Sequence, residues 1–359
     1  MAADALDVDP KAVAEHAEEL VRDCLALNPV VVLGSGASAG LGLPTMPELA
    51  DRILEAVDVK TLKDPDKPRW DIFQKALAAD EGLEPALNKA NLDEDSPLFH
   101  QIVDIVWKAV IEKDAAVFEG CRIGSELPHA RLFSYLLGSA ARHVSVVTPN
   151  YDRLAEYGAD QAGIPCRTGF SGSYFRQWSG WTSGSQYERH DRRRLDLYKV
   201  HGSLDWFREQ ADHDPTSLPV SPGGSVPTGM RPVIVPPSRD KYRQSQFDPY
   251  RSLMTEADRV LKSADAFFCV GYGFNDVHVQ LYLNQALRQR PKPLVMISWG
   301  LTENAQAAIT QASKDLRYCV MTRADDGSGT VVRTHEHRDG VFIEGLDTWS
   351  FDGFAREYL

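Results

Sequence analysis

Apolar residues recur along the chain at two different spacings, and these spacings predict its helices and strands. Residues 11–27 place six of them on one side of a helix: Val13, Ala17, Leu20, Val21, Cys24 and Leu25. This spacing predicts an amphipathic helix, which Asn28-Pro29 then ends. Val30 to Leu33 follows as a short, wholly apolar run. Such a run is expected of a strand that is buried on both faces of a parallel sheet.

Five further short apolar runs predict strands. They are Val144 to Val147, Leu197 to Val200, Val233 to Val235, Ala266 to Val270 and Leu294 to Ile297. Helical patterns lie between several of these runs, at residues 248–263, 276–289 and 302–314. Alternation of strands and helices is typical of βαβ units. The sequence therefore predicts an α/β fold with a Rossmann-like, doubly wound parallel sheet.

A helical segment is predicted to interrupt this Rossmann-like domain. Residues 1–57 hold the N-terminal helix and the first part of the Rossmann-like domain, including a helical pattern from Met46 to Val57. Residues 58–140 carry long helical patterns and no convincing strand, which predicts a helical insertion. Residues 141–320 complete the domain, with loops expected at 167–190 and 209–232.

Residues 321–359 predict a short C-terminal β/α extension. Val331 to Thr334 and Val341 to Glu344 have the character of a hairpin, and a short helix follows. We expect this extension to contact another subunit.

Composition excludes several classes of protein. The net charge of −12 disfavours bulk affinity for nucleic acid, which needs clustered cations. The one basic run, Arg192 to Arg194, is interpreted as a solvated loop or a contact between subunits. We find no signal peptide and no apolar run long enough to span a membrane, so the expected location is the cytoplasm.

The histidines and cysteines do not predict a metal site. The five cysteines are scattered and form no CxxC pair, which argues against a disulfide framework and against structural zinc. His335 and His337 alternate near the C-terminus, but no third ligand is evident. We interpret this pair as an exposed strand face.

A glycine-rich loop follows the first predicted strand. It reads Gly34-Ser-Gly36-Ala-Ser38-Ala-Gly40-Leu-Gly42. A strand, a glycine loop and a helix can bind phosphate through backbone N–H groups and the helix dipole. The loop lacks both the GxGxxG and the Walker pattern, so a tight turn without a ligand remains the alternative.

Three more polar stretches directly follow predicted strands. They are Thr148-Pro-Asn150-Tyr-Asp152, His201-Gly-Ser-Leu-Asp-Trp206 and Gly271-Tyr-Gly-Phe-Asn-Asp276. Ligands of open α/β sheets bind beyond the carboxyl ends of the strands. The four stretches together therefore predict one ligand site.

In this order the stretches resemble the sirtuin family, and more closely its bacterial sirtuin-like branch. Gly34 to Ser38 with Gly42-Leu-Pro44 matches the GAGxS…GIP loop. Thr148, Asn150 and Asp152 match the TQNxD motif with Pro149 in place of Gln, and His201-Gly202 matches the catalytic His-Gly pair. Gly271 to Gly273 loosely matches the later glycine loop. The resemblance covers roughly residues 29–300.

Two departures bear on the activity. Residues 203–265 contain no cysteine, whereas sirtuin deacylases carry a four-cysteine zinc ribbon there. Thr45-Met46-Pro47 replaces the Asp-Phe-Arg that follows the GIP triplet in deacylases. Both changes are typical of bacterial sirtuin-like proteins that hydrolyse NAD, often as antiphage effectors.

The resemblance implies NAD⁺ as the substrate and assigns roles to individual residues. Asn150 would hold a water or the ribose edge, and His201 would take a proton from a ribose hydroxyl. Helix capping by Asn150 and Asp152, and a structural histidine at 201, are the alternatives. The residues expected to bind the dinucleotide are Gly34, Ser35, Gly36, Ala37, Ser38, Pro44, Thr148, Asp152, Gly271, Tyr272, Gly273, Asp276 and Ser298.

Some of these roles stay open at this point. Asp152 would orient the nicotinamide carboxamide, and Ser298 would contact the adenosine ribose by position alone. Asp276 would bond a ribose hydroxyl or cap the helix that follows. Aromatic residues at Tyr174, Trp178 and Trp181 would form a lid or a surface interaction loop.

The sequence therefore predicts an NAD⁺ glycohydrolase in which Asn150 and His201 are catalytic. A non-enzymatic sensor of NAD⁺ or of an ADP-ribose derivative, and an NAD-dependent deacylase, are the alternatives. An activity that depletes NAD would need gating, so we expect a homo-oligomer or a separate partner such as a HerA-type ATPase.

Overall fold

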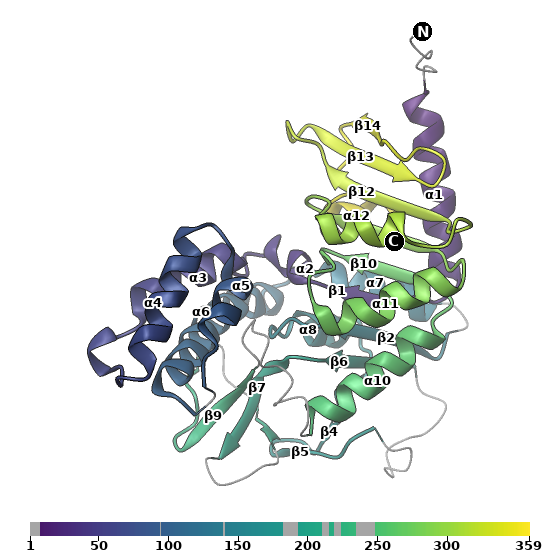
Figure 1. Cartoon of the computed structure of the whole chain (residues 1–359). Helices are drawn as coiled ribbons and strands as arrows, with labels where there is room; N and C mark the ends of the chain where they lie inside the picture. Colours follow the sequence, from purple (N-terminus) through teal and green to yellow (C-terminus); the bar gives the residue numbers. More distant parts are fainter. Residues whose placement is uncertain are drawn as a thin grey trace.

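A nine-stranded sheet forms the centre of the molecule. The computed structural model describes residues 8–93, 95–138, 141–181, 193–209, 215–218, 224–234 and 248–359. The strand order is β14-β13-β12-β11-β10-β1-β2-β6-β3 (Figure 1). The bounds are β1 (Val30–Leu33), β2 (His143–Thr148), β3 (Cys166–Arg167), β6 (Arg194–Lys199), β10 (Phe267–Val270), β11 (Leu294–Ser298), β12 (Tyr318–Arg323), β13 (Gly329–Thr334) and β14 (Val341–Glu344).

The strand order confirms the Rossmann-like prediction. Every pairing within the run β6-β2-β1-β10-β11-β12 is parallel. Read in chain order, these strands follow the doubly wound pattern in which the chain leaves β1 in both directions. The switch point lies between β1 and β10, where the ligand crevice of such sheets is expected.

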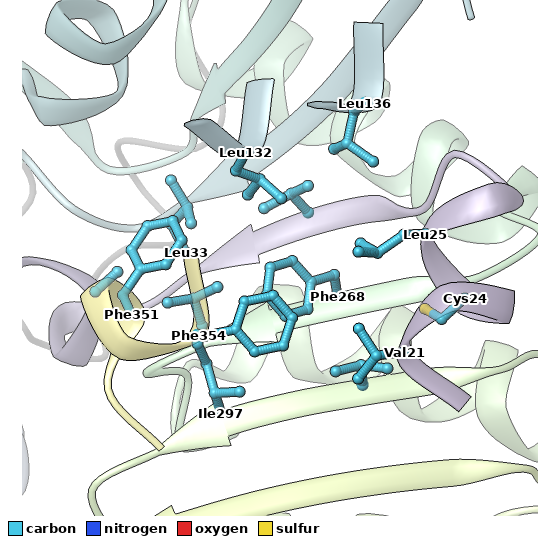
Figure 2. Packing of buried hydrophobic residues seen from close by; sticks show 14 of the residues in the cluster. Val21, Cys24, Leu25, Leu33, Leu132, Leu136, Phe268, Ile297, Phe351 and Phe354 are labelled. Atoms are coloured by element: carbon cyan, nitrogen blue, oxygen red, sulfur yellow. The ribbon is translucent and has the colours of Figure 1, made fainter. Parts of the chain in front are cut away.

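Helices cover both faces of this sheet (Figure 1). One face packs against α1 (Pro10–Ala26), α7 (Pro128–Gly138), α8 (Leu154–Gln161) and α13 (Phe351–Tyr358). Figure 2 shows this packing, with Val21 and Cys24 of α1, Leu132 of α7 and Phe354 of α13 around the strand residue Phe268. The other face packs against α10 (Tyr250–Ser263), α11 (Val277–Gln289) and α12 (Glu303–Thr310).

The apolar run at β1 follows from this two-sided burial. Val31 and Leu33 point into the first core, and Val30 and Val32 point into the second. Side chains alternate between faces along a strand, so each position of a central strand must be apolar. No helix in the described ranges is both long enough and apolar enough to cross a bilayer.

The helical insertion packs around a third core, which it shares with Leu154, Leu204, Phe207 and Ile234. Its boundaries differ from the predicted 58 and 140. It comprises α3 (Met46–Ala56), η1 (Val59–Thr61), α4 (Asp66–Ala78), α5 (Leu83–Ala90) and α6 (Pro97–Arg122). The helix α3 belongs to this cluster, whereas α7 packs on the sheet. Both helices are amphipathic, and sequence periodicity does not reveal which partner an apolar face will meet.

A second sheet of five strands lies beside the insertion (Figure 1). Its order is β4-β5-β8-β7-β9. The bounds are β4 (Phe170–Ser171), β5 (Arg176–Trp178), β7 (Gly202–Glu209), β8 (Thr216–Ser217) and β9 (Met230–Ile234).

This sheet corrects three sequence predictions. Strands occur within the segments 167–190 and 209–232 that were expected to be loops, although parts of both lie outside the described residues. The predicted strand at Val233 belongs to this second sheet, where β9 pairs antiparallel with β7. The strand β7 was missed because Gly202, Ser203 and Asp205 give its start the composition of a polar loop, although its first six residues are all buried.

The C-terminal hairpin and terminal helix are confirmed. β13 and β14 pair antiparallel, and β13 also pairs with β12. These strands extend the main sheet instead of forming a separate unit. The boundary at residue 321 therefore falls inside β12.

Candidate functional site

Two glycine loops pack directly against each other at the switch point. The Gly34 N–H donates to the carbonyl of Val270 over 2.9 Å, and the Gly36 N–H donates to the carbonyl of Gly271 over 3.1 Å. A Cβ on Gly34 would lie 2.3 Å from the Gly271 oxygen. Close approach of the two loops therefore explains Gly34, Gly36 and Gly271, whether or not a phosphate also binds there.

Replacing Gly271 by alanine is expected to lower the free energy of unfolding by about 2 kcal/mol or more. Gly271 has φ +55°, and an added Cβ would lie 2.3 Å from the Gly36 carbonyl carbon. Gly40→Ala is the matched control, because a Cβ there meets nothing within 4 Å. Thermal denaturation followed by circular dichroism checks the difference. Equal midpoints for the two variants would contradict the loop packing.

Asn150 is fixed by the first glycine loop. Its Nδ2 donates to the Gly34 carbonyl over 2.8 Å and to Ser38 Oγ over 3.1 Å. Its backbone N–H donates to Thr148 Oγ1 over 3.0 Å, and that hydroxyl donates to the carbonyl of Leu33. Both amide hydrogens of the side chain are thus engaged, and Oδ1 remains as an acceptor. Asn150 does not cap α8, because the N-cap residue of that helix is Arg153.

Asp152 is engaged on both oxygens. Oδ2 accepts from Ser38 Oγ over 2.7 Å, and Oδ1 accepts from the N–H of Leu154 in the first turn of α8. Burial raises the pKa of Asp152, and the nearby Lys199 charge and the Ser38 hydrogen bond partly oppose this shift. The capping alternative is therefore observed for Asp152. A nicotinamide contact would have to share an oxygen that Ser38 already uses.

Three residues that sequence reasoning missed anchor the loop at 150–153. Lys199, fully buried at the end of β6, donates to the carbonyls of Tyr151 and Asp152 and to Glu156 Oε1. Arg153 forms a buried ion pair with Asp114 of α6. A lysine inside the otherwise apolar run from Leu197 to Val200 was the available signal for Lys199. Nothing in the sequence connects Asp114 with Arg153.

His201 lies beside Asp276. Nε2 of His201 is 3.0 Å from Oδ2 of Asp276, and both side chains are buried. Oδ1 of Asp276 caps α11 by accepting from the N–H groups of His278 and Val279. Asp276 thus serves as a cap and also contacts the candidate base. From the sequence, a ribose contact and the cap were the two predicted roles of Asp276, and its contact with His201 was not predicted.

The backbone brings Asn150 and His201 to the same edge of the sheet. Thr148 of β2 pairs with Lys199 of β6, and the Val200 N–H donates to the carbonyl of Thr148 over 3.0 Å. Each candidate lies two residues beyond this paired position.

Gly202 explains the form of the turn after His201. It has φ +91°, and a Cβ would lie 2.0 Å from the carbonyl oxygen of Val233 in β9. Only glycine allows β7 and β9 to approach this closely while the chain turns out of the main sheet. The His-Gly pair thus links the candidate base to the second sheet.

The remaining predicted residues surround this edge. Ser35 and Gly36 are exposed, whereas Ala37 and Ser38 are buried, and Pro44 is half-buried before α3. The Tyr272 hydroxyl donates to the carbonyl of Asp276. Thr302 Oγ1 donates to the carbonyl of Gly273, and Ser298 ends β11.

Two of the three aromatic residues that were predicted to form a lid or a surface interaction loop pack against other aromatic rings. Trp178 packs edge-on against Phe170, and Trp181 lies 4.4 Å from the ring of Tyr198. Tyr174 alone of the three predicted aromatics is strongly exposed.

The basic run predicted as a solvated loop or a contact between subunits is described only in part. Arg194 forms an ion pair with Asp196, and Arg192 lies outside the described residues.

Residues 144–319 match the SIR2-like domain family. The SIR2-like match begins in β2 and ends in β12, so it contains Asn150, His201 and Asp276 but not the first glycine loop. A search of curated proteins found no match.

Solved structures of Sir2 proteins are also similar to this chain. A Sir2 homologue–NAD complex is 15% identical, over 84% of this chain and 87% of that chain, with a TM-score of 0.40. A mutant Sir2 homologue in complex with ADP-ribose is 17% identical, over 83% and 88%, with a TM-score of 0.41. A third, a mutant in complex with 2′-O-acetyl ADP-ribose, is 16% identical, over 89% and 92%, with a TM-score of 0.40.

Proposed function

We propose that this protein is an NAD⁺ glycohydrolase, which converts NAD⁺ and water to ADP-ribose, nicotinamide and a proton. The observation that carries the proposal is the arrangement of Asn150. Both of its amide hydrogens are held by the first glycine loop, so Oδ1 is a fixed acceptor beyond the carboxyl ends of β1 and β2. The SIR2-like match over residues 144–319 supports NAD⁺ as the ligand.

The residues at this edge fit a dinucleotide substrate. The edge is the switch point of a Rossmann-like sheet, where dinucleotides bind. Neither Asn150 nor His201 is a permanent cation, so neither opposes the positive charge that develops on the ribose when the bond to nicotinamide breaks. Asn150 can accept a hydrogen bond from the attacking water without adding charge.

His201 supplies the base in this proposal. When water adds to the ribose C1′, the electron pair of the broken bond leaves with the nicotinamide nitrogen, and the water loses a proton. His201 takes up this proton, directly or through a ribose hydroxyl. The Asp276 carboxylate 3.0 Å from Nε2 stabilises the protonated ring.

Purified protein incubated with NAD⁺ alone is expected to release nicotinamide and ADP-ribose in equal amounts, measured by chromatography. Release only after an acyl-lysine peptide is added would favour a deacylase. Tight NAD⁺ binding without turnover would favour a sensor. Either result would refute the proposal.

We further propose that the activity is gated, in keeping with an antiphage effector that depletes NAD. Unrestrained hydrolysis would kill the cell that makes the protein. The resemblance to sirtuin-like defence proteins supports gating by homo-oligomerisation or by a HerA-type ATPase partner. The same assay, run across protein concentrations and with the co-expressed partner, tests this. A monomer that is fully active alone would contradict it.

A further inference from the structure

Two histidines and a glutamate from opposite ends of the chain meet on the sheet face covered by α1. His16 lies in α1, and His335 and Glu336 directly follow β13. Nε2 of His16 is 3.8 Å from Oε2 of Glu336, and Nε2 of His335 is 3.9 Å from Oε1 of Glu336. One ligand-type atom from each of the three residues lies within 4.8 Å of the other two.

Hydrogen bonds satisfy this group only in part, since His335 bonds the backbone of Tyr318 through one nitrogen alone. Nε2 of His16 and Nδ1 of His335 are both buried from solvent, and neither has a hydrogen-bond partner among the described residues. The carboxylate contacts of 3.8 and 3.9 Å are longer than a hydrogen bond. Two buried nitrogens without partners are rare in folded proteins and call for an explanation.

We propose that His16, His335 and Glu336 bind one divalent transition-metal ion, of which zinc fits best. Two imidazoles and one carboxylate are a common zinc ligand set, with water in the fourth position. Tetrahedral zinc with bonds of about 2.1 Å places its ligands about 3.4 Å apart. Small side-chain rotations from the observed spacing reach this geometry. Bound metal would satisfy Nε2 of His16, which faces Glu336 and has no hydrogen-bond partner among the described residues.

Neighbouring contacts hold the ligands in place. Thr334 Oγ1 accepts from the N–H groups of Glu336 and His337, which fixes the turn that carries two of the ligands. An ion pair between Arg317 and Asp23 joins α1 to the loop before β12.

The metal would fasten the C-terminal hairpin to α1. Thr334 pairs with Cys319 near the start of β12, so the group lies toward the amino ends of the parallel strands. Asn150 and His201 lie at the opposite edge, beyond the carboxyl ends. The metal is therefore assigned a role in stability and not in the reaction, which separates this proposal from the proposed hydrolysis.

Full-length protein freed of metal by a chelator and titrated with zinc chloride is expected to bind one equivalent, measured by calorimetry. Zinc should also raise the midpoint of thermal unfolding. His16→Ala and Glu336→Gln should each weaken binding at least about tenfold and remove most of the thermal shift. The matched control is His337→Ala, because His337 lies next to the group without belonging to it.

The outcomes separate a built site from surface binding. Equal affinity in the His16→Ala and His337→Ala proteins, or binding retained after all three ligands are replaced, would overturn the proposal. Failure of the wild-type protein to bind zinc, cobalt or nickel at micromolar concentration would overturn it as well. Cobalt gives a separate check, because tetrahedral coordination produces a strong visible absorption that Glu336→Gln should reduce.

Discussion

Replacing Asn150 by alanine is expected to slow NAD⁺ hydrolysis about 100-fold or more. The substitution removes the Oδ1 acceptor that would position the attacking water, and misplacement of a reacting group by about 1 Å is enough for an effect of this size. The measurement is the initial rate of nicotinamide release by purified protein at saturating NAD⁺. A decrease in kcat with little change in NAD⁺ affinity would assign Asn150 to the reaction itself.

Two further variants distinguish positioning from folding. Ser38→Ala removes one of the two hydrogen bonds that hold Nδ2 of Asn150 and leaves the bond to Gly34, so we expect a smaller decrease of roughly tenfold. Asn150→Asp keeps the size of the side chain but sets a carboxylate against the Gly34 carbonyl, and it should be nearly inactive. An Asn150→Ala protein with wild-type thermal stability and undiminished hydrolysis would refute the proposed role.

The anchoring of Asn150 was only partly predictable from the sequence. Asn150 and His201 can be found in the sequence, because each follows an apolar strand and all such strand ends meet at one edge. The hydrogen bonds and ion pairs that hold the loop of Asn150 cannot be found in this way. Lys199 and Asp114 act through long-range contacts, from β6 and from the helical insertion. A single sequence contains no record of which distant residues meet.

The fold was also predictable only in part, in the main sheet and not in the second sheet. Strands such as β1 and β10 are wholly apolar because helices cover both faces, and this leaves a clear signal in the sequence. The second sheet leaves almost none, since β4 and β8 have two residues each, too few to show alternation. The proposed metal ligands could not be predicted from the sequence either, because His16 and His335 come from opposite ends of the chain and only the fold brings them together.

Replacing His201 by alanine is expected to lower the rate of NAD⁺ hydrolysis by about 100-fold or more, within the usual range for loss of a general base. The adjacent Asp276 gives a sharper test, because its two oxygens have different tasks. Oδ1 caps α11, and Oδ2 lies 3.0 Å from Nε2 of His201. One substitution can therefore remove the charge and keep the cap.

Asp276→Asn is that substitution. Asparagine caps a helix about as well as aspartate, so the thermal stability of this variant should remain close to wild type. Its neutral amide no longer stabilises a protonated His201, so the rate should still fall about tenfold or more. Asp276→Ala loses the cap as well and should lower the free energy of unfolding by about 1 kcal/mol.

A double variant of His201 and Asp276 decides whether the pair acts as a unit. If Asp276 serves His201, the double variant His201→Ala/Asp276→Asn should be no slower than His201→Ala alone, because the carboxylate has nothing left to stabilise. If the fold-decreases in rate of the two single variants multiply in the double variant, Asp276 acts independently of His201, for example through the ribose contact predicted from the sequence. Full activity in Asp276→Asn, with the cap intact, would show that its charge plays no part in the reaction and that its role is confined to α11.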